Sequence, residues 1–220
     1  MPPDSFGIIL LKIVVLVFSV VFHEVSHGWV AERCGDPTAR FMGRLTLNPV
    51  PHLDLYGSIL LPGMLALLHS PFLFGYAKPV PVDPRNFRNP RIDGIKVALV
   101  GPFSNLFLAT VSAVLLGVVA RFVGTENALV TFLQLGVVVN CLLAVFNLIP
   151  VPPLDGSWLL EHTLRGAAYN AYRAVRPYGM LILIGILLFP PVSNLLIGAP
   201  VTYLSGALFD MSELIARSFS

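Results

Sequence analysis

The feature that most constrains this sequence is its long stretches without charge. Residues 97–120, 128–154 and 178–209 contain no charged side chain, and residues 6–22 contain only Lys12. About 20 apolar residues, with a lower limit near 17, are enough for a helix to cross the hydrocarbon layer of a bilayer. The chain is 55% hydrophobic and 12% charged, which is far from the balance of a soluble domain. The sequence therefore predicts a protein that crosses a membrane several times.

The basic residues predict which ends of these spans face the cytoplasm. Eleven of the fourteen Lys and Arg residues fall in three stretches between the apolar runs. They are Arg33, Arg40, Arg44, Lys78, Arg85, Arg88, Arg91, Lys96, Arg165, Arg173 and Arg176. Short loops rich in Lys and Arg stay in the cytoplasm, and residues 1–6 carry no basic side chain. The first span is thus expected to run from outside to inside. A net charge of +2 does not suggest a nucleic-acid partner.

We expect an all-α polytopic membrane protein with about four membrane-crossing helices. Residues 1–220 form one integral membrane domain, with an interfacial helix at about residues 157–176 whose arginines face lipid phosphates. The expected spans are residues 6–31, 97–120, 128–149 and 178–197. Cys34 and Cys141 have no paired spacing and are expected to be free thiols.

The uncharged residues 57–77 raise a problem, because basic stretches flank them on both sides. A single crossing would put one of those stretches outside. Since prolines and glycines interrupt the segment, we interpret it as a re-entrant segment or hairpin that enters and leaves on the cytoplasmic side. The alternative is an ordinary span that violates the charge rule.

Residues 41–47 alternate weakly between polar and apolar side chains, which favours a short β-strand near the active site. An extended peptide could pair its backbone with the edge of such a strand. A surface loop is an equally good interpretation.

The motif His23-Glu24-Val25-Ser26-His27 lies near the inner end of the first apolar run. On a helix, the four-residue step puts His23 and His27 one above the other, close enough to share a metal ion. In metallohydrolases with this HExxH pattern, two neutral imidazoles hold zinc and the carboxylate between them takes a proton from water. The alternative is a polar cap on a buried helix, but unpartnered polar groups are costly in a membrane. Ten helical residues from His23 to Arg33 put the metal about 15 Å below the cytoplasmic surface.

A catalytic zinc usually has three protein ligands, so a third is needed. Asp155 is the only acid near the end of the 128–149 span, which is expected to run inward like the first. A divalent cation would stabilise its charge at that depth. Taken alone, Leu154-Asp155-Gly156 is more typical of an Asx-type turn. The competing acids are Asp54, Asp83, Asp93 and Glu161.

Two further motifs accompany HExxH. They are Gly101-Pro102-Phe103-Ser104-Asn105 and Asn147-Leu148-Ile149-Pro150-Val151-Pro152-Pro153-Leu154-Asp155-Gly156. With HExxH they resemble the site-2 protease family of intramembrane zinc metalloproteases, over most of the chain. HExxH also occurs in many soluble proteases, whereas the distant N-x-x-P-x-P-x-L-D-G run makes the resemblance specific. Larger relatives carry an inserted PDZ-like domain or a C-terminal nucleotide-sensing domain, and we expect this chain to be a small form without them.

The resemblance implies that His23, His27 and Asp155 hold one Zn²⁺ per chain and that Glu24 is the catalytic base. It implies an intramembrane endopeptidase that cuts single-pass membrane proteins in regulated intramembrane proteolysis. We expect it in a bacterial or archaeal cell membrane, with its active site toward the cytoplasm. The resemblance leaves the oligomeric state open.

Three asparagines and a lysine have less certain roles. By resemblance, Asn147 steadies the substrate carbonyl or the oxyanion, and Asn105 supports the same cavity. From the residues alone, Asn147 could instead satisfy carbonyls freed by Pro150, and Asn140 is expected to be structural. Lys12 either snorkels to the outer surface or lines the substrate path.

Two other functions fit parts of the sequence. A prenyl-protein-type membrane protease also uses HExxH, but its third ligand comes from a helical E-x-x-x-D. Glu126, Glu161 and Glu213 are followed four residues later by Val130, Arg165 and Arg217, so that motif is missing. A zinc-binding transporter or scaffold would have ligands on several spans without a lone glutamate beside them.

Overall fold

The computed structural model describes residues 6–54, 78–123 and 127–218 of the chain. Within these ranges the regular structure is helical, and no strand forms. The long helices are α1 (Phe6–Arg33), α4 (Pro90–Val123), α5 (Ala128–Asn147) and α10 (Ala199–Ser218). The shorter α-helices are α2 (Thr38–Phe41), α6 (Asp155–Thr163), α7 (Gly166–Val175), α8 (Gly179–Leu188) and α9 (Pro190–Ser193). The expectation of an all-α polytopic fold is confirmed.

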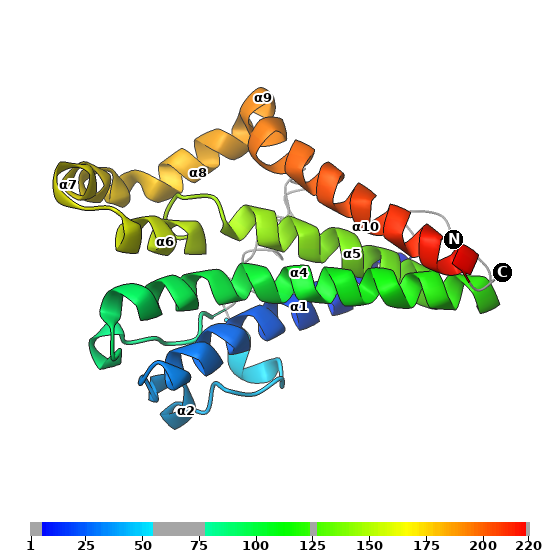
Figure 1. Cartoon of the computed structure of the whole chain (residues 1–220), viewed down its shortest axis with the longest axis horizontal. Coiled ribbons are helices and arrows are strands. Elements are labelled where there is room, and N and C mark those ends of the chain that lie inside the picture. The colour runs from blue at the N-terminus through cyan, green and yellow to red at the C-terminus, as the bar shows by residue number, and fades with distance from the viewer. Residues whose placement is uncertain (1–5, 55–77, 124–126, 219–220) are drawn as a thin grey trace.

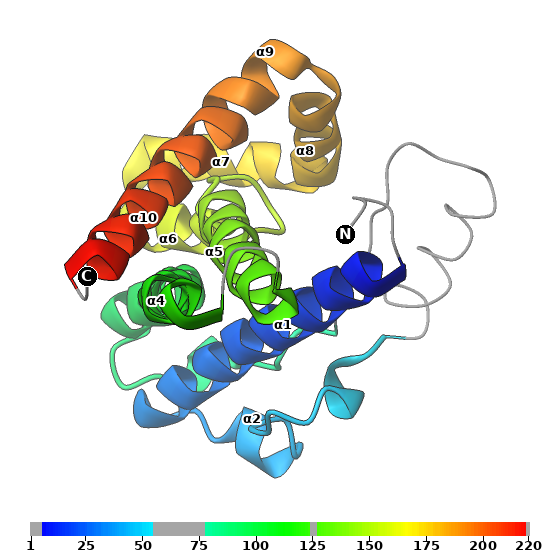
Figure 2. The ribbon, with the colours of Figure 1, turned by 90° about the vertical axis from the view of Figure 1, so that its right-hand side faces the viewer.

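Helices α1, α4 and α5 pack side by side and form the centre of the molecule (Figures 1 and 2). Helix α4 begins at Pro90, where the missing N–H costs nothing, and α5 begins after Asn127, whose side chain accepts the N–H of Leu129 at 2.8 Å. Small buried residues, Ala109 and Ala113, let α4 approach α5 closely. Close backbone approach of this kind is how helices associate in a membrane, where apolar burial gives little driving force.

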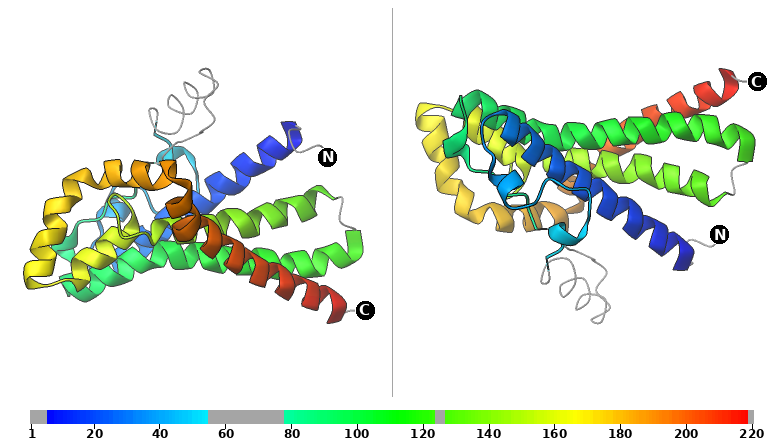
Figure 3. Two further views of the ribbon diagram at one scale, coloured as in Figure 1. Left: turned by 90° about the horizontal axis from the view of Figure 1, so that it is seen from above. Right: turned by 90° about the horizontal axis from the view of Figure 1, so that it is seen from below.

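The helices are long and apolar enough for a multi-pass membrane protein. Among the described residues, five helical stretches could cross a bilayer by length and composition, and the first three contain α1, α4 and α5. The other two are residues 166–188 and 190–218. Figure 3 shows that the start of α1 and the end of α10 lie at one end of the molecule, whereas α6 and α7 lie at the other.

In the structure, residues 178–197 do not form the single continuous helix that was expected of a span. Helix α8 ends at Leu188, and Phe189 is extended, with φ −106° and ψ 96°. The reason is Pro190, because a proline disfavours the helical conformation of the residue before it. A second helical stretch, α9, the π-turn η5 (Asn194–Gly198) and α10, then runs to Ser218. Helices α8 and α10 meet at a bend (Figure 1), so the span expected at residues 178–197 corresponds to parts of two helical stretches.

The helix expected at residues 157–176 is two helices. Helix α6 starts at Asp155 and ends at Thr163, and Leu164 and Arg165 are extended before α7 begins at Gly166, whose φ is +56°. A left-handed φ is adopted readily by glycine, which fits the break at this point.

The strand expected at residues 41–47 is wrong. Helix α2 covers Phe41, and Gly43, with φ +66°, ends it. The N–H of Arg44 reaches back to the carbonyl of Ala39 at 2.9 Å, and that of Gly43 to Arg40 at 2.9 Å. These bonds make a helix C-cap of the Schellman type. The polar and apolar alternation therefore arose from a cap and the turns after it. The expected re-entrant segment at 57–77 lies outside the described residues.

Candidate metal centre

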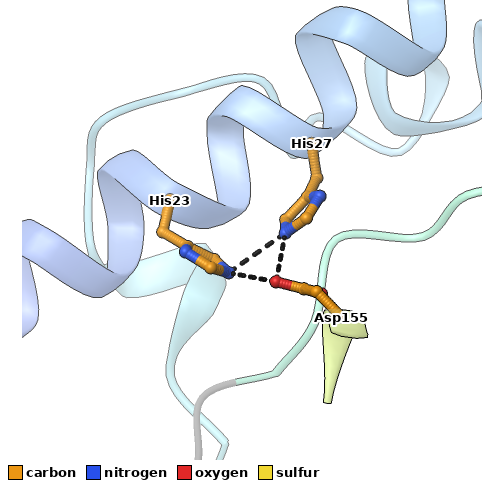
Figure 4. Close-up of side chains that lie close together, drawn as sticks. All are labelled: His23, His27 and Asp155. Atoms are coloured by element: carbon orange, nitrogen blue, oxygen red, sulfur yellow. Dashed lines mark hydrogen bonds and ion pairs between the residues drawn. The ribbon is translucent and has the colours of Figure 1, made fainter. Parts of the chain in front are cut away.

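His23 and His27 lie on one face of α1 and point at the same place (Figure 4). Their Nε2 atoms are 3.0 Å apart, and both residues are buried. The i, i+4 step of the helix accounts for this pairing.

Asp155, the first residue of α6, completes the cluster from another part of the chain (Figure 4). Its Oδ2 atom lies 3.1 Å from Nε2 of His23 and 3.2 Å from Nε2 of His27. The proline-rich turn after α5 brings it there, and Gly156 fits that turn because a Cβ would overlap the Leu148 carbonyl. Among the described residues, this is the one group of three or more His, Cys, Asp or Glu side chains that could hold a metal.

The three facing atoms suit a zinc ion. Bonds of about 2.0–2.1 Å in a tetrahedral arrangement put ligand atoms about 3.3 Å apart, close to the three distances found. Oδ2 of Asp155 is buried and has no hydrogen-bond partner among the described residues. A buried carboxylate oxygen of this kind needs a positive partner.

The other nitrogen of each imidazole has a partner that orients the ring. Nδ1 of His23 lies 2.7 Å from Oδ1 of Asn105, and Nδ1 of His27 lies 2.7 Å from the carbonyl oxygen of Val97. Both partners are acceptors, so each Nδ1 carries the proton and donates. Each Nε2 then presents its lone pair to the cluster, as in metal-bound histidines.

Gly101 of α4 lies directly against both imidazoles. A Cβ at this position would overlap Nε2 of His27 and crowd the ring of His23. The motif that begins at Gly101 thus contributes a glycine that makes room for the rings and an asparagine that binds one of them.

Glu24 lies beside the cluster and is held by backbone from a distant segment. Its Oε2 accepts the N–H of Val80 at 2.8 Å. Residues 78–83 have no regular structure, because Pro79 and Pro81 prevent a helix. Arg44, itself buried, donates to the carbonyl of Lys78 at 2.7 Å and to that of Pro79 at 3.3 Å. Arg44 therefore holds the segment that contacts Glu24.

A cavity of about 300 Å³ adjoins the cluster. Its lining combines the polar side chains His23, Glu24, His27, Asn147 and Asp155 with the apolar residues Pro79, Val80, Val82, Val97, Ala98, Pro153 and Trp158. A few polar groups converging in an apolar pocket are typical of an active site.

Asn147 lines this cavity, and its Nδ2 donates to the carbonyl of Leu143 at 2.9 Å. One amide hydrogen thus binds the asparagine's own helix, and the other has no partner among the described residues. The carbonyl that it binds is one turn earlier in α5 and is not the one freed by Pro150.

The competing acids that have described partners bind elsewhere. Asp83 pairs with Arg85, whose hydrogen bonds lower the pKa of the Asp83 carboxyl to about 2. Asp93 pairs with Lys96, and Glu161 pairs with Arg176.

Several other residues have clear places. Lys12 is exposed on α1, so a position on an interior path is not supported. Cys34 and Cys141 are free thiols, as expected. Sequence reasoning missed the backbone groups of Val80 and Val97, because no side-chain pattern marks a backbone contact.

The matches of this chain to known proteins agree with a zinc-binding site. The model of peptidase family M50 matches residues 11–124 and 118–190. YwhC of Bacillus subtilis, named as a zinc metalloprotease, is 36% identical over 184 residues, which cover 81% of this chain and 80% of YwhC. Rip2 of Mycolicibacterium smegmatis, also named so, is 30% identical over 200 residues, 88% of this chain and 72% of Rip2. MJ0611 of Methanocaldococcus jannaschii, again a named zinc metalloprotease, is 25% identical over 164 residues, 73% of this chain and 74% of MJ0611. No solved structure matches the chain significantly.

Proposed function

Because this chain belongs to peptidase family M50, the site-2 protease family, we propose that it cuts single-span membrane proteins inside the bilayer, in regulated intramembrane proteolysis. It is a membrane-embedded metalloprotease whose cofactor is zinc. The observation that carries the proposal is the convergence of His23, His27 and Asp155 within 4.8 Å of one another, beside Glu24.

His23, His27 and Asp155 hold the zinc ion in this proposal. Bound zinc supplies an activated water and polarises the scissile carbonyl. Glu24 accepts the proton that this water loses as its oxygen attacks the carbonyl carbon. When the C–N bond breaks, Glu24 returns that proton to the amine nitrogen that leaves. The N–H of Val80 holds one carboxylate oxygen of Glu24, so the other is free to carry the proton.

Asn147 assists from the cavity wall. The amide hydrogen that is not bound to Leu143 is available for the substrate carbonyl or for the oxyanion that develops on it.

The substrate has to unwind before it is cut. In a helix, each peptide group is shielded by its own backbone hydrogen bonds and by the side chains around it, so the scissile carbonyl is not accessible to attack. An extended peptide is thinner and exposes the carbonyl that a helix shields. Residues 78–82 offer it an extended neighbour in place of the strand first expected at 41–47. Within the described part of the chain, the Val80 carbonyl and the Val82 N–H have no hydrogen-bond partner.

The active site is proposed to work from the cytoplasmic side. The eleven basic residues of the three charged stretches lie at the end of α1, in and after α2, in residues 78–89 and the first turns of α4, and between α6 and the end of α7 or just after it. Those elements gather at one end of the molecule (Figure 1), and loops rich in Lys and Arg stay in the cytoplasm.

The test compares membrane-protein fragments in cells that carry wild type, Glu24→Gln or the control Glu32→Gln. Glu32 lies on the same helix and pairs with Arg40. We expect fragments with wild type and Glu32→Gln, none with Glu24→Gln, and bound zinc in all three purified proteins. Cleavage by a zinc-loaded Glu24→Gln variant would show the mechanism to be wrong. Zinc bound as tightly by Asp155→Ala as by wild type would place the third ligand elsewhere.

A further inference from the structure

A buried chain of polar side chains runs from the metal centre into the protein. It consists of Ser19 and His23 on α1, Asn105 on α4 and Asn140 on α5, each at most 6% exposed. Polar groups at this depth in a membrane protein are costly unless they are paired, and here they are paired with one another.

Two backbone carbonyls fix which way the asparagine amides point. Nδ2 of Asn105 donates to the carbonyl of Ser19 at 3.4 Å, and Nδ2 of Asn140 donates to the carbonyl of Gly136 at 2.9 Å. A carbonyl oxygen can only accept, so the nitrogen of each amide must lie on that side.

The remaining bonds follow from this orientation. Oδ1 of Asn140 accepts from Nδ2 of Asn105 at 2.9 Å, and Nδ2 of Asn140 also donates to Oγ of Ser19 at 2.9 Å. Oδ1 of Asn105 is then the atom that faces Nδ1 of His23, at 2.7 Å. Because that oxygen only accepts, His23 must carry its proton on Nδ1 and offer the Nε2 lone pair.

We propose that Asn105 is a positioning residue that fixes the tautomer and ring orientation of His23 for zinc, and that Asn140 fixes Asn105. This rests on the proposed role of His23 as a zinc ligand. Partners of this kind behind a metal-bound histidine typically change metal affinity by about 10- to 100-fold. His27 has the Val97 carbonyl for the same purpose, so the side-chain network serves His23 alone.

A purely structural role makes a different prediction. If the asparagines only join α1, α4 and α5, their loss lowers the stability of the zinc-free and zinc-loaded forms alike. It leaves zinc affinity and the His23 tautomer unchanged. Zinc affinity, measured by competition with a chelator, therefore separates the two roles.

Four variants of the full-length protein in detergent make the comparison. Asn105→Leu removes the acceptor for His23, and we expect zinc to bind about 10- to 100-fold more weakly. Asn105→Asp keeps that acceptor but not the donor to Asn140, so affinity stays near wild type while the melting temperature falls. Asn140→Leu removes one of the two acceptors that hold Nδ2 of Asn105 and leaves the Ser19 carbonyl, so we expect zinc to bind only a few-fold more weakly. Ser104→Ala is the matched control, because Ser104 is the buried neighbour whose hydroxyl binds only the Gly101 carbonyl of its own helix, and we expect no change in affinity.

The wild-type protein provides a second test that no folding defect can disturb. Nitrogen-15 NMR of histidine-labelled, zinc-free protein should show His23 protonated at Nδ1, with the signal assigned by loss in His23→Ala. The inference is overturned if His23 carries its proton on Nε2, or if folded Asn105→Leu binds zinc like wild type. Either result leaves the proposed protease standing, whereas a wild type that binds no zinc refutes the proposed function itself.

Discussion

In the proposed zinc site, the two histidines and Asp155 depend on neighbours that contribute shape or orientation and are not themselves proposed as ligands. Gly101 is the clearest case, since the backbone of α4 passes so close to both rings that no side chain fits. Affinity at this centre is therefore a property of the α1–α4 packing as well as of the three ligands.

Substitution of Gly101 by alanine tests this dependence. The added methyl group overlaps both imidazoles, so the rings must turn or the helices must separate. We expect Gly101→Ala to weaken zinc binding at least about 10-fold, the scale of losing a ligand's orientation. Gly206→Ala is the control, because a Cβ at that helical position meets nothing within 4 Å. Equal zinc affinity in the two variants would mean that the close approach is unimportant.

At this scale the sequence predicted that His23, His27 and Asp155 come together, but it indicated little of what holds them in place. The pairing of the two histidines of HExxH was predicted from their spacing on a helix. The choice of Asp155 was predicted from its position at the end of an inward-running span. That Asn105 lies against His23 depends on how α4 packs on α1, and that Val97 lies against His27 involves a backbone oxygen. Neither contact can be recognised from the local sequence pattern.

Among the elements, the extended segment at residues 78–82 is the one that we propose positions Glu24. It contacts Glu24 through Val80, and Val80 and Val82 line the cavity. Gly28 of α1 lets it approach, since a Cβ there would crowd Val80 at 2.8 Å and Leu45 at 2.6 Å. The sequence misassigned the extended role to residues 41–47 because a Schellman cap at Gly43 imitates a strand pattern over a few residues. The two prolines of 78–82 exclude a helix but do not reveal what the segment contacts.

Arg44 is predicted to act on Glu24 through this segment. Without its guanidinium, the carbonyls of Lys78 and Pro79 lose their donor and the Val80 N–H shifts. We expect Arg44→Ala to keep its zinc and to cleave about 10- to 100-fold more slowly, the cost of a misplaced catalytic group. Arg40→Ala is the matched control, because Arg40 lies in the same stretch with its side chain 67% exposed. Unchanged single-turnover cleavage by Arg44→Ala would contradict the link.

Asp36, between α1 and α2, should make the stability of this region depend on pH. Burial acts to raise its pKa, but hydrogen bonds from Thr38, Asn86 and Asp83 outweigh it and leave the pKa below the usual value. A lowered folded-state pKa means that the stabilisation is complete above about pH 4 and is lost as the pH falls below that.

Melting temperatures in detergent check this sign. We expect Asp36→Asn to melt below wild type at pH 7, and the gap to narrow as the pH falls below about 4. Asp210→Asn, on the exposed side of α10, should follow the wild-type profile at every pH. If the difference in melting temperature between Asp36→Asn and wild type widened in acid, the direction assigned to the pKa shift of Asp36 would be wrong.

For the whole molecule, the charge-free stretches predicted the fold class well because a bilayer allows few alternatives to helices. The bend at Phe189 was harder to predict from the sequence, since a proline can either kink a helix or end it. The start of α1 and the end of α10 lie at the same end of the molecule (Figure 3), opposite α6 and α7. The proposed orientation in the membrane rests on that asymmetry of basic residues.

Labelling of single cysteines tests the orientation. In a background with Cys34→Ser and Cys141→Ala, an impermeant maleimide should label Arg217→Cys in intact cells, because the proposed orientation puts the end of α10 outside. Arg165→Cys, at the basic end between α6 and α7, should be labelled only after permeabilisation. Both positions are exposed. The opposite labelling pattern would show that the protein has the reverse orientation in the membrane, with the metal centre toward the outside.

The most direct measurement is the position of the bond that the purified protein cuts. Wild type and Glu24→Gln, each loaded with zinc, are reconstituted into liposomes with a single-span substrate, and the fragments are mapped by mass spectrometry. We predict a cut by wild type inside the span, in the half that faces the basic end of the enzyme, and none by Glu24→Gln. A cut confined to the soluble part of the substrate, or equal cleavage by Glu24→Gln, would contradict an intramembrane zinc protease that uses this site.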